Sequence, residues 1–156
     1  MIRGIHHVGI NCRDLDRMIR FYTEAFGFEQ VHTMGWEKSP FLDTVVDVPG
    51  SACKGALMRC GNAYIELFQY SAPPPRIDEP LKPNDRGYTH FCVDVTDMAN
   101  DIEHFRKCGM DFGEREYGDF GVSKAIYGYD PEGNVIEIQE CGPGNANPLT
   151  ALMGGK

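Results

Sequence analysis

The sequence predicts an α+β fold made of two consecutive β-α-β-β-β modules, and three observations lead to this prediction. The stretch GIHHVGINCRDLDRMIRFYTEAFG near the start recurs in the second half as GYTHFCVDVTDMANDIEHFRKCG. Each copy begins with a short β-prone run that carries a histidine, His7 or His90, and continues into a helical pattern of apolar residues. Each half then ends on an apolar, strand-like run with a glutamate in its middle, Glu66 or Glu137.

The first module spans residues 4–70 and begins with a short apolar run that predicts a buried strand. Asp14 is the expected N-cap of the helix that follows, and Gly27 stands where a left-handed glycine ends a helix. Gly61 and the asparagine after it predict a hairpin turn. The expected elements are strand 5–12, helix 15–26, strand 28–36, a loop with a short strand around 40–50, and strands 54–60 and 63–70.

The second module spans residues 87–141 and follows a linker at 71–86 that holds five prolines. Proline at this density excludes helix and central strand, so the linker is expected to be largely extended. The module repeats the order of the first. Its expected elements are strand 87–95, helix 97–107 ended by Gly109, and strands 110–117, 122–129 and 134–141. The tail 142–156 is rich in glycine and proline and is expected to fray or to reach a partner.

Length and charge limit the classes of function. At 156 residues the chain suits one compact domain and is short for two, so the modules are expected to form a single domain over residues 1–156. A net charge of −8 argues against nucleic acid or an anionic membrane as a partner. No apolar run reaches the roughly 20 residues that span a bilayer, and no signal peptide is recognisable, which predicts a cytoplasmic location. The six cysteines lack zinc-like spacing and are expected to be reduced thiols.

The two glutamates occupy an unusual position in the middle of apolar strands. Alternate residues of a strand share a face, and the neighbours of Glu66 and Glu137 on the opposite face are apolar. One such glutamate would most often face water, but here the arrangement occurs twice, each time in a half opened by a matching histidine. Two histidines and two glutamates are typical ligands of a divalent metal. The pattern therefore predicts a metal site formed by four side chains: His7, Glu66, His90 and Glu137.

Other chemistries find less support in the sequence. There is no GxSxG, no P-loop and no dinucleotide-binding GxGxxG followed by a βαβ unit. Cys92 lies in the second histidine-bearing strand and is the alternative nucleophile, but no neighbouring feature indicates a lowered pKa for its thiol. His6 has no counterpart in the second copy, where Thr89 stands, and it is left out of the predicted site.

Paired modules with the motifs HVGI, YIEL, THFCV and VIEI resemble the vicinal oxygen chelate superfamily, and the resemblance covers residues 5–140. That superfamily includes glyoxalase I, methylmalonyl-CoA epimerase, extradiol dioxygenases and bleomycin- or fosfomycin-resistance proteins. The resemblance implies that the mixed sheets curl into a cleft, with ligands on the first and last strand of each module. Carried over to this chain, the implied metal ligands are His7, Glu66, His90 and Glu137.

The second ligand discriminates among members of that superfamily. Glu66 is similar to the glyoxalase I pattern, whereas epimerases usually carry glutamine there. Asn11 stands where glyoxalase I enzymes usually place an arginine that holds a glutathione carboxylate, and Tyr70 stands where they often place asparagine. We therefore expect weak or absent activity with methylglyoxal and glutathione. A glutathione adduct would need another cation, and the candidates are Arg13, Lys38, Arg59 and Lys124.

The resemblance implies a metal-dependent lyase or isomerase of the glyoxalase type. Two neighbouring oxygens of a small substrate would chelate the metal, whose Lewis acidity stabilises an enediolate formed when a proton is removed next to a carbonyl. The base would be Glu137 or Glu66. Nickel, cobalt, manganese, zinc or iron would fit such ligands.

Three other functions stay open from the sequence. One is an extradiol-type ring-cleaving dioxygenase, which uses two histidines and one glutamate and would take up oxygen with catechols. Another is an isomerase like methylmalonyl-CoA epimerase. The third is a resistance-type protein that only binds a small molecule, with an affinity that does not depend on metal.

The expected assembly is a homodimer with two-fold symmetry. An extended chain spans up to roughly 3.3 Å per residue, so the linker at 71–86 is long enough for the second module to fold onto the first or to swap to a neighbouring chain. Whether the metal site lies within one chain or across two is open at this stage.

Overall fold

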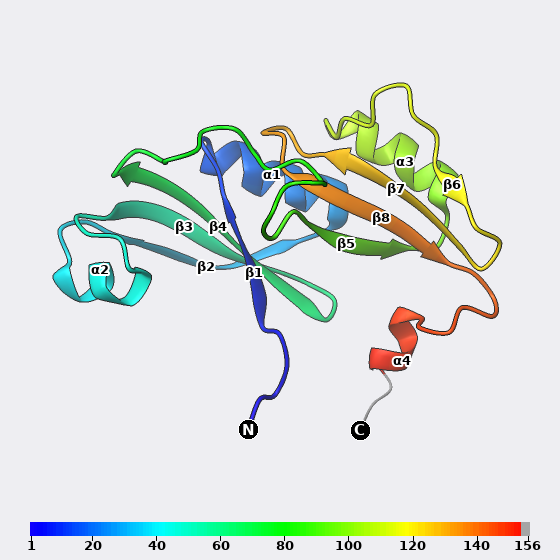
Figure 1. The fold of residues 1–156 in the computed structure, drawn as a ribbon, viewed down its shortest axis with the longest axis horizontal. Coiled ribbons are helices and arrows are strands. Elements are labelled where there is room, and N and C mark those ends of the chain that lie inside the picture. The colour runs from blue at the N-terminus through cyan, green and yellow to red at the C-terminus, as the bar shows by residue number, and fades with distance from the viewer. Residues whose placement is uncertain (154–156) are drawn as a thin grey trace. The chain divides into compact units, whose positions relative to one another are not determined.

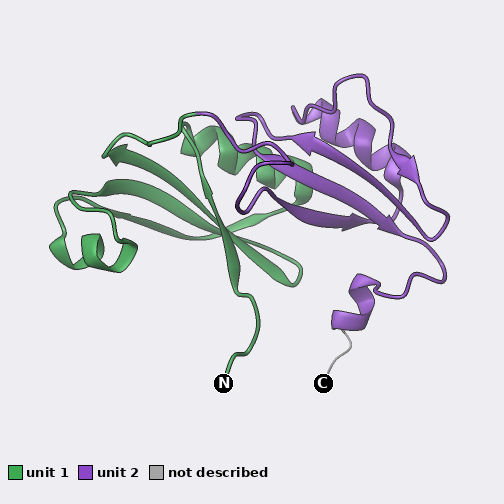
Figure 2. Cartoon of the chain, viewed as in Figure 1, with its two compact units in different colours: residues 1–78 green, residues 79–156 purple. Residues whose placement is uncertain are grey.

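The structure is a computed structural model that describes residues 1–153. The chain divides into two compact units, Met1–Asp78 and Glu79–Lys156 (Figure 2), and their boundary falls inside the proline-rich segment 71–86. Each unit contains helices and one mixed four-stranded sheet. The predicted α+β class is confirmed, and the β-α-β-β-β order recurs in both units, with one additional helix inside that order in unit 1.

Unit 1 has one sheet in which the histidine strand and the glutamate strand are neighbours. The strand order is β1-β4-β3-β2, with β1 parallel to β4 and the other pairs antiparallel. His7 and Glu66 therefore lie on adjacent strands, although two helices and two strands separate them in sequence. The elements are β1 (His7–Asn11), α1 (Leu15–Phe26), β2 (Glu29–Trp36), α2 (Pro40–Val46), β3 (Ala52–Cys60) and β4 (Ala63–Ala72) (Figure 1).

Local sequence sets both ends of α1. Asp14 has an extended backbone, and its carboxylate accepts the N–H of Arg17, as an N-cap does. Gly27 has a φ of 70° and donates its N–H to the carbonyl of Thr23. Both predicted helix ends are confirmed. The buried face of the helix packs on β3 and β4 with five side chains: Leu15, Met18, Phe21, Tyr22 and Ala25.

The position of α1 decides which face of the sheet is available for a site. Ile65 and Leu67 of β4 are almost fully buried, together with Ala56 on β3. Strand alternation turns Glu66 and Phe68 to the opposite face. The apolar residues beside the glutamate therefore anchor the strand in the core, and the glutamate lies on the other face of the sheet.

Unit 2 repeats this arrangement. Its strand order is β5-β8-β7-β6, and β5 runs parallel to β8. α3 packs on β8 and buries Met98, Ile102 and Phe105. The tail, which was expected to fray, holds the short helix α4. The elements are β5 (His90–Val95), α3 (Met98–Lys107), β6 (Gly118–Asp119), β7 (Ser123–Tyr129), β8 (Val135–Cys141) and α4 (Leu149–Met153).

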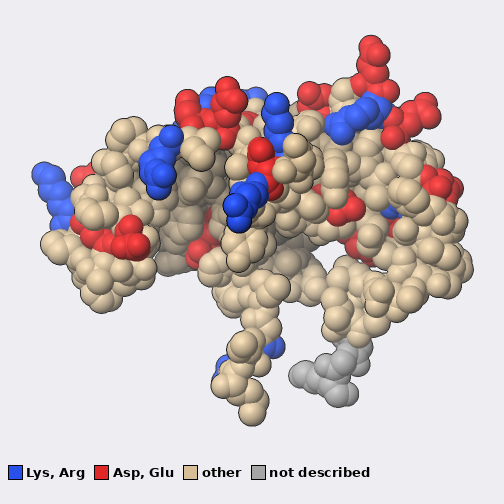
Figure 3. Space-filling view, viewed as in Figure 1, with Lys and Arg blue, Asp and Glu red and all other residues tan. Residues whose placement is uncertain are grey.

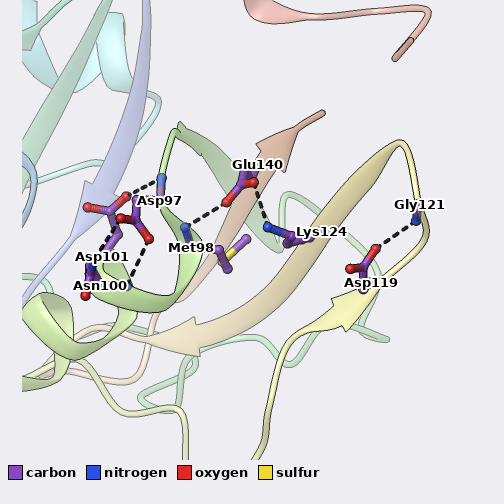
Figure 4. A network of polar contacts seen from close by, with 8 residues as sticks. All are labelled: Asp97, Met98, Asn100, Asp101, Asp119, Gly121, Lys124 and Glu140. Atoms are coloured by element: carbon purple, nitrogen blue, oxygen red, sulfur yellow. Dashed lines mark hydrogen bonds and ion pairs between the residues drawn. The ribbon is translucent and has the colours of Figure 1, made fainter. Parts of the chain in front are cut away.

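A polar contact at the start of the helix also repeats. The carboxylate of Glu140 accepts the N–H of Met98 at 2.8 Å and a hydrogen bond from Lys124 Nζ at 2.7 Å (Figure 4). In unit 1 the side chain of Gln69 accepts the N–H of Leu15 at 3.0 Å. The Lys124 hydrogen bond and then that of Met98 lower the pKa of Glu140, so the carboxylate is charged at neutral pH. Each last strand thus fixes the first turn of its helix.

The segment around 40–50 differs from the expected loop and short strand, because it forms α2. Ser39 is the N-cap and accepts the N–H of Leu42 at 3.3 Å, and Pro40 takes the first helical position. The fixed φ of proline suits that position. This helix has only seven residues, so it is too short to show the apolar periodicity that predicts longer helices.

The expected strand at 110–117 is wrong. Only Asp111 pairs there, in an isolated bridge, and its side chain accepts the N–H of Gly113 at 2.7 Å. Gly113 has a φ of 59°, so the chain turns instead of extending. Met110 and Phe112 are nevertheless buried. The apolar alternation that resembles a strand therefore reflects two anchoring side chains beside a turn.

The expectation that the first strand is buried is also wrong. Only Ile10 of β1 is buried, and Val8 is 37% exposed. Among the described residues 1–153, β1 lies at the edge of its sheet and pairs with β4 alone, while α1 packs on the other strands. The apolar composition of this strand is therefore only partly used inside unit 1.

Two expectations drawn from composition can be compared with the structure. All six cysteines are free thiols, and Cys12 and Cys53 are buried, as expected for reduced core residues. Among residues 1–153, no helix has the length and apolar character needed to cross a membrane.

Candidate metal centre

The first predicted pair, His7 and Glu66, is brought together on one face of the unit 1 sheet. The parallel register sets Gly9 opposite Glu66, which places the histidine of β1 one alternation away on the same face. His7 Nε2 lies 3.0 Å from a carboxylate oxygen of Glu66. The side chains are 39% and 21% exposed, so both are reachable from solvent but partly shielded from it.

The second predicted pair, His90 and Glu137, has the same geometry in unit 2. Cys92 is opposite Glu137 in the parallel register, which again places the histidine one alternation away. His90 Nε2 lies 3.3 Å from a carboxylate oxygen of Glu137, and the side chains are 29% and 21% exposed. The internal repeat therefore extends from the fold to the atoms of the two pairs.

The other ring nitrogen of each histidine is held by the residue that precedes it. His6 Nδ1 lies 2.9 Å from His7 Nδ1, and the His6 ring stacks on Tyr64 with centroids 4.9 Å apart. Thr89 Oγ1 lies 2.9 Å from His90 Nδ1. The sequence pattern left His6 out of the predicted site because the residues before His7 and His90 differ: one is His6 and the other is Thr89. Both residues are polar, however, and both can form a hydrogen bond with an imidazole nitrogen, which is a signal that the comparison of the repeats missed.

Each pair consists of side chains that divalent metals commonly bind. An imidazole Nε2 and a carboxylate oxygen are common ligands, and a metal-bound histidine usually has its other nitrogen fixed by a hydrogen bond. In each pair a hydrogen bond between Nε2 and the carboxylate needs a proton, and a cation can take the place of that proton. Among residues 1–153, no three His, Cys, Asp or Glu side chains gather in a group that could hold a metal. Each pair supplies two ligands, so four ligands require both pairs.

The environment of the second pair argues against a cysteine nucleophile. Burial, and next the charge of Glu137, raise the pKa of the Cys92 thiol to about 12. A thiol with that pKa is protonated at neutral pH and is a poor nucleophile. Burial followed by the same glutamate also raises the pKa of Tyr127, whose ring lies 4.8 Å from the His90 ring. Cys92 and Tyr127, beside the His90–Glu137 pair, are therefore uncharged at neutral pH.

Three of the four candidate cations for a glutathione carboxylate already have acidic partners. Each forms an ion pair of 3.1 Å or less: Arg13 with Asp78, Arg59 with Glu29, and Lys124 with Glu140. On the face drawn in Figure 3, the Lys and Arg side chains of the described residues form separate groups among acidic and uncharged atoms. The charges therefore favour local ion pairs over a site for a polyanionic substrate.

The chain is similar to known proteins of one superfamily. The model of the Glyoxalase/Bleomycin resistance protein/Dioxygenase superfamily matches residues 4–138. The lactoylglutathione lyase of Schizosaccharomyces pombe is 24% identical over 141 residues, which are 86% of this chain and 46% of that enzyme. The chain thus spans about half the length of this relative.

Solved structures show the same fold. A glyoxalase family protein from Bacillus cereus has a TM-score of 0.80 at 21% identity, covering 91% of this chain and 96% of that chain. The fosfomycin resistance protein FosX from Listeria monocytogenes, complexed with Mn(II) and sulfate, has a TM-score of 0.59 at 17% identity, covering 98% and 99%. The family match includes all four predicted ligand residues. The chain belongs to the glyoxalase, bleomycin resistance protein and dioxygenase superfamily.

Proposed function

We propose that the protein is a divalent-metal-dependent lyase or isomerase of the glyoxalase type, which moves a proton next to a carbonyl group of a small substrate. The observation that carries the proposal is the repeated pair, in which His7 Nε2 faces Glu66 at 3.0 Å and His90 Nε2 faces Glu137 at 3.3 Å. A histidine that only packs in the core has no need of a carboxylate at the matching position of both repeats. The lactoylglutathione lyase among the relatives supports the same class of reaction.

The four side chains would act together on one metal ion. The imidazoles of His7 and His90 and the carboxylates of Glu66 and Glu137 would hold the ion, and neighbouring substrate oxygens would bind to it as well. When bound, the ion would supply Lewis acidity that stabilises negative charge on those oxygens. Manganese is a reasonable first metal to test because the Listeria FosX structure contains Mn(II), and nickel, cobalt, zinc and iron also suit these ligands.

The chain's own carboxylates would perform the proton transfer. Glu66 or Glu137 would accept a proton from the substrate carbon on a carboxylate oxygen and return it to the adjacent carbon or to the same carbon. Both side chains are 21% exposed, which lets a substrate reach them while limiting competing water. His7 and His90 would stay oriented through their Nδ1 contacts with His6 and Thr89.

Metal analysis followed by an assay panel tests this function. Protein purified without chelator should contain close to one divalent ion for each set of two pairs. The metal-loaded protein should then be assayed with methylmalonyl-CoA, fosfomycin, catechol, and methylglyoxal plus glutathione. We expect carbon-bound proton exchange with a substrate that has vicinal oxygens, and weak or absent activity with glutathione. Failure to bind any divalent metal would contradict the proposal, and oxygen uptake with catechol would favour a dioxygenase instead.

For methylglyoxal and glutathione, the turnover number tests the expectation of weak activity. Asn11 and Tyr70 offer no positive charge for a glutathione carboxylate, and Arg13 and Arg59 are in ion pairs. A turnover on the order of 10²–10³ per second with methylglyoxal and glutathione would show that these positions do not exclude it.

We further propose that the protein acts as a homodimer with two-fold symmetry. The exposed edge strand β1 supports this, because Val8 and the neighbouring Ile5 are 37% and 92% exposed. Mixing a His7→Ala chain with a His90→Ala chain decides how the sites are built. Activity that returns on mixing would mean that two chains share each site, whereas no recovery despite confirmed subunit exchange would mean that each chain builds its own. A purely monomeric protein at micromolar concentration, measured by light scattering, would contradict the dimer.

A further inference from the structure

Three aromatic side chains gather on one face of unit 1, and we name Trp36, Phe68 and Tyr70 the aromatic wall. The ring centroids are 6.3 Å apart for Trp36 and Phe68, 6.1 Å for Trp36 and Tyr70, and 6.1 Å for Phe68 and Tyr70. All three residues are half-buried, so parts of their surfaces remain accessible. Trp36 is also the only tryptophan of the chain.

The strand register places the aromatic wall on the same face as Glu66. Phe68 and Tyr70 follow the glutamate by two and four residues on β4, which is roughly 7 and 13 Å along a strand. Trp36 is opposite Cys53, and Cys53 is opposite Tyr70. Trp36 and Tyr70 therefore lie in one row across the sheet, with Cys53 between them. A molecule whose oxygen atoms reach Glu66 would therefore extend over the wall if it lies along β4.

Trp36 is held in place by a chain of hydrogen bonds that passes through one buried residue, Ser51. Its indole N–H donates to Ser51 Oγ at 2.7 Å, and the Ser51 hydroxyl donates to the carboxylate of Asp43 at 2.7 Å. Ser51 is fully buried. Asp43 lies on α2, beside the end of β2 in Figure 1, and also accepts the N–H groups of Gly50 and Ser51 at 2.8 Å each. These hydrogen bonds, first that of the Ser51 hydroxyl, lower the pKa of Asp43, so the anchor stays charged.

The ring of Phe68 packs against Gly55, which has no side chain. A Cβ added at Gly55 would lie 2.9 Å from Phe68 Cδ1 and 3.2 Å from Met34 Cγ. The phenyl ring thus occupies the space above the glycine. Tyr70 is also partly desolvated, since burial and then Cys53 raise the pKa of its phenol. The wall is therefore a set of positioned rings and not a group of side chains left loose on the surface.

The charges on this face select against an anionic ligand tail. Arg59 is the one cation that the register places there among the described strand residues, and it is paired with Glu29 at 2.9 Å. Opposite Phe68 stands Asn11, which is uncharged. The uncharged residues that the register places on this face include Gly9, Met34, Gly55 and Leu57.

We infer that the ligand of this site carries an aromatic ring that packs on Trp36, Phe68 and Tyr70 while two vicinal oxygens reach the His7–Glu66 pair. The position of the ligand's two oxygens rests on the proposed function. The position of its ring rests on the aromatic wall alone, because aromatic rings attract one another in offset and edge-to-face arrangements and bury much apolar area. The substrate class is an aryl-substituted α-hydroxy or α-oxo compound.

The single tryptophan makes the test direct. Zinc-loaded protein is titrated with mandelate and with lactate, which share the α-hydroxy acid and differ in the phenyl ring, while Trp36 fluorescence is recorded. We expect mandelate to bind about tenfold or more tightly than lactate and to change the Trp36 emission. Equal affinities, or mandelate binding with no change in emission, would overturn the inference.

Two variants separate the wall from a general preference for apolar ligands. Phe68→Leu, at the ring nearest to Glu66 along β4, should bring the mandelate-to-lactate affinity ratio close to one, chiefly by weakening mandelate binding. Phe120→Leu, at an aromatic residue of unit 2 that is 68% exposed, should leave the ratio as it is. A ratio that falls equally in both variants would overturn the inference. So would a Trp36 emission that shifts with protein concentration and not with mandelate, because a second copy of the chain would then cover the wall.

The same titration on metal-free protein distinguishes the two proposals. If zinc binds but the two acids bind equally, the aromatic-ligand inference fails and the metal proposal stands. If no metal binds, the metal proposal fails, and the metal-free titration alone tests the aromatic-ligand inference. A retained preference for mandelate supports that inference, and equal binding of the two acids overturns it.

Discussion

His90→Ala is expected to remove stoichiometric metal and to lower activity by more than about 100-fold while the protein stays folded. The estimate follows because losing only an outer partner of a metal ligand costs roughly 10–100-fold in affinity or activity, and His90 is proposed as a ligand itself. The fold should persist because the side chain is partly exposed and its interactions are with Glu137, Thr89 and Tyr127. Metal content, circular dichroism and turnover of the substrate found in the assay panel measure these effects.

Two matched variants make this result interpretable. His104→Ala changes an exposed histidine of the same unit, on α3, and should leave metal content and activity unchanged. Thr89→Val removes the hydroxyl that faces His90 Nδ1 and should weaken metal binding by about 10–100-fold, an intermediate effect, whereas Thr89→Ser should restore it. Full metal occupancy in His90→Ala would remove this residue from the proposed site.

Exchange of the glutamates for glutamine is the second change with a large expected effect. A glutamine oxygen can still bind a metal but cannot serve as the proton acceptor. We expect one of Glu66→Gln and Glu137→Gln to lose about 10²–10⁴-fold in kcat, the range of a general base, while both keep measurable metal. The variant with the larger loss identifies the base.

Solvent isotope exchange separates proton transfer from binding in these variants. The variant that lacks the base should bind substrate but exchange deuterium into the substrate carbon at a rate reduced by the same factor as kcat. If both glutamine variants lose metal completely and regain activity at high metal concentration, both carboxylates are ligands only. The proposed role as base would then be wrong.

A large part of the fold could be predicted because it is encoded by local periodicity and by repetition. Apolar spacing and the capping residues Asp14 and Gly27 fix α1, and the structure confirms both ends. Alternation along β4 places Glu66 on the face opposite Ile65, and α1 confirms this by packing on the apolar face. The repeat also identified both His–Glu pairs, which the structure brings together within each unit.

Where the predictions fail, short segments depend on contacts that local periodicity does not contain. α2 has only seven residues and begins at a capping serine and a proline. In the segment expected as a strand, Asp111 binds the N–H of Gly113 and turns the chain, although the buried Phe112 gives the sequence a strand-like alternation. The edge position of β1 follows from strand order, which no local pattern specifies.

The sequence by itself determined the two-module architecture, the ends of α1 and the four candidate ligands, because each depends on residue spacing along one element or on comparison of the two repeats. Only the tertiary structure decided what surrounds the ligands. It set His6 against His7 and joined Trp36 to Phe68 and Tyr70 through the register of strands that are distant in sequence. Register and side-chain packing arise from the whole sheet closing over α1, and so they cannot be read from any single stretch of the chain.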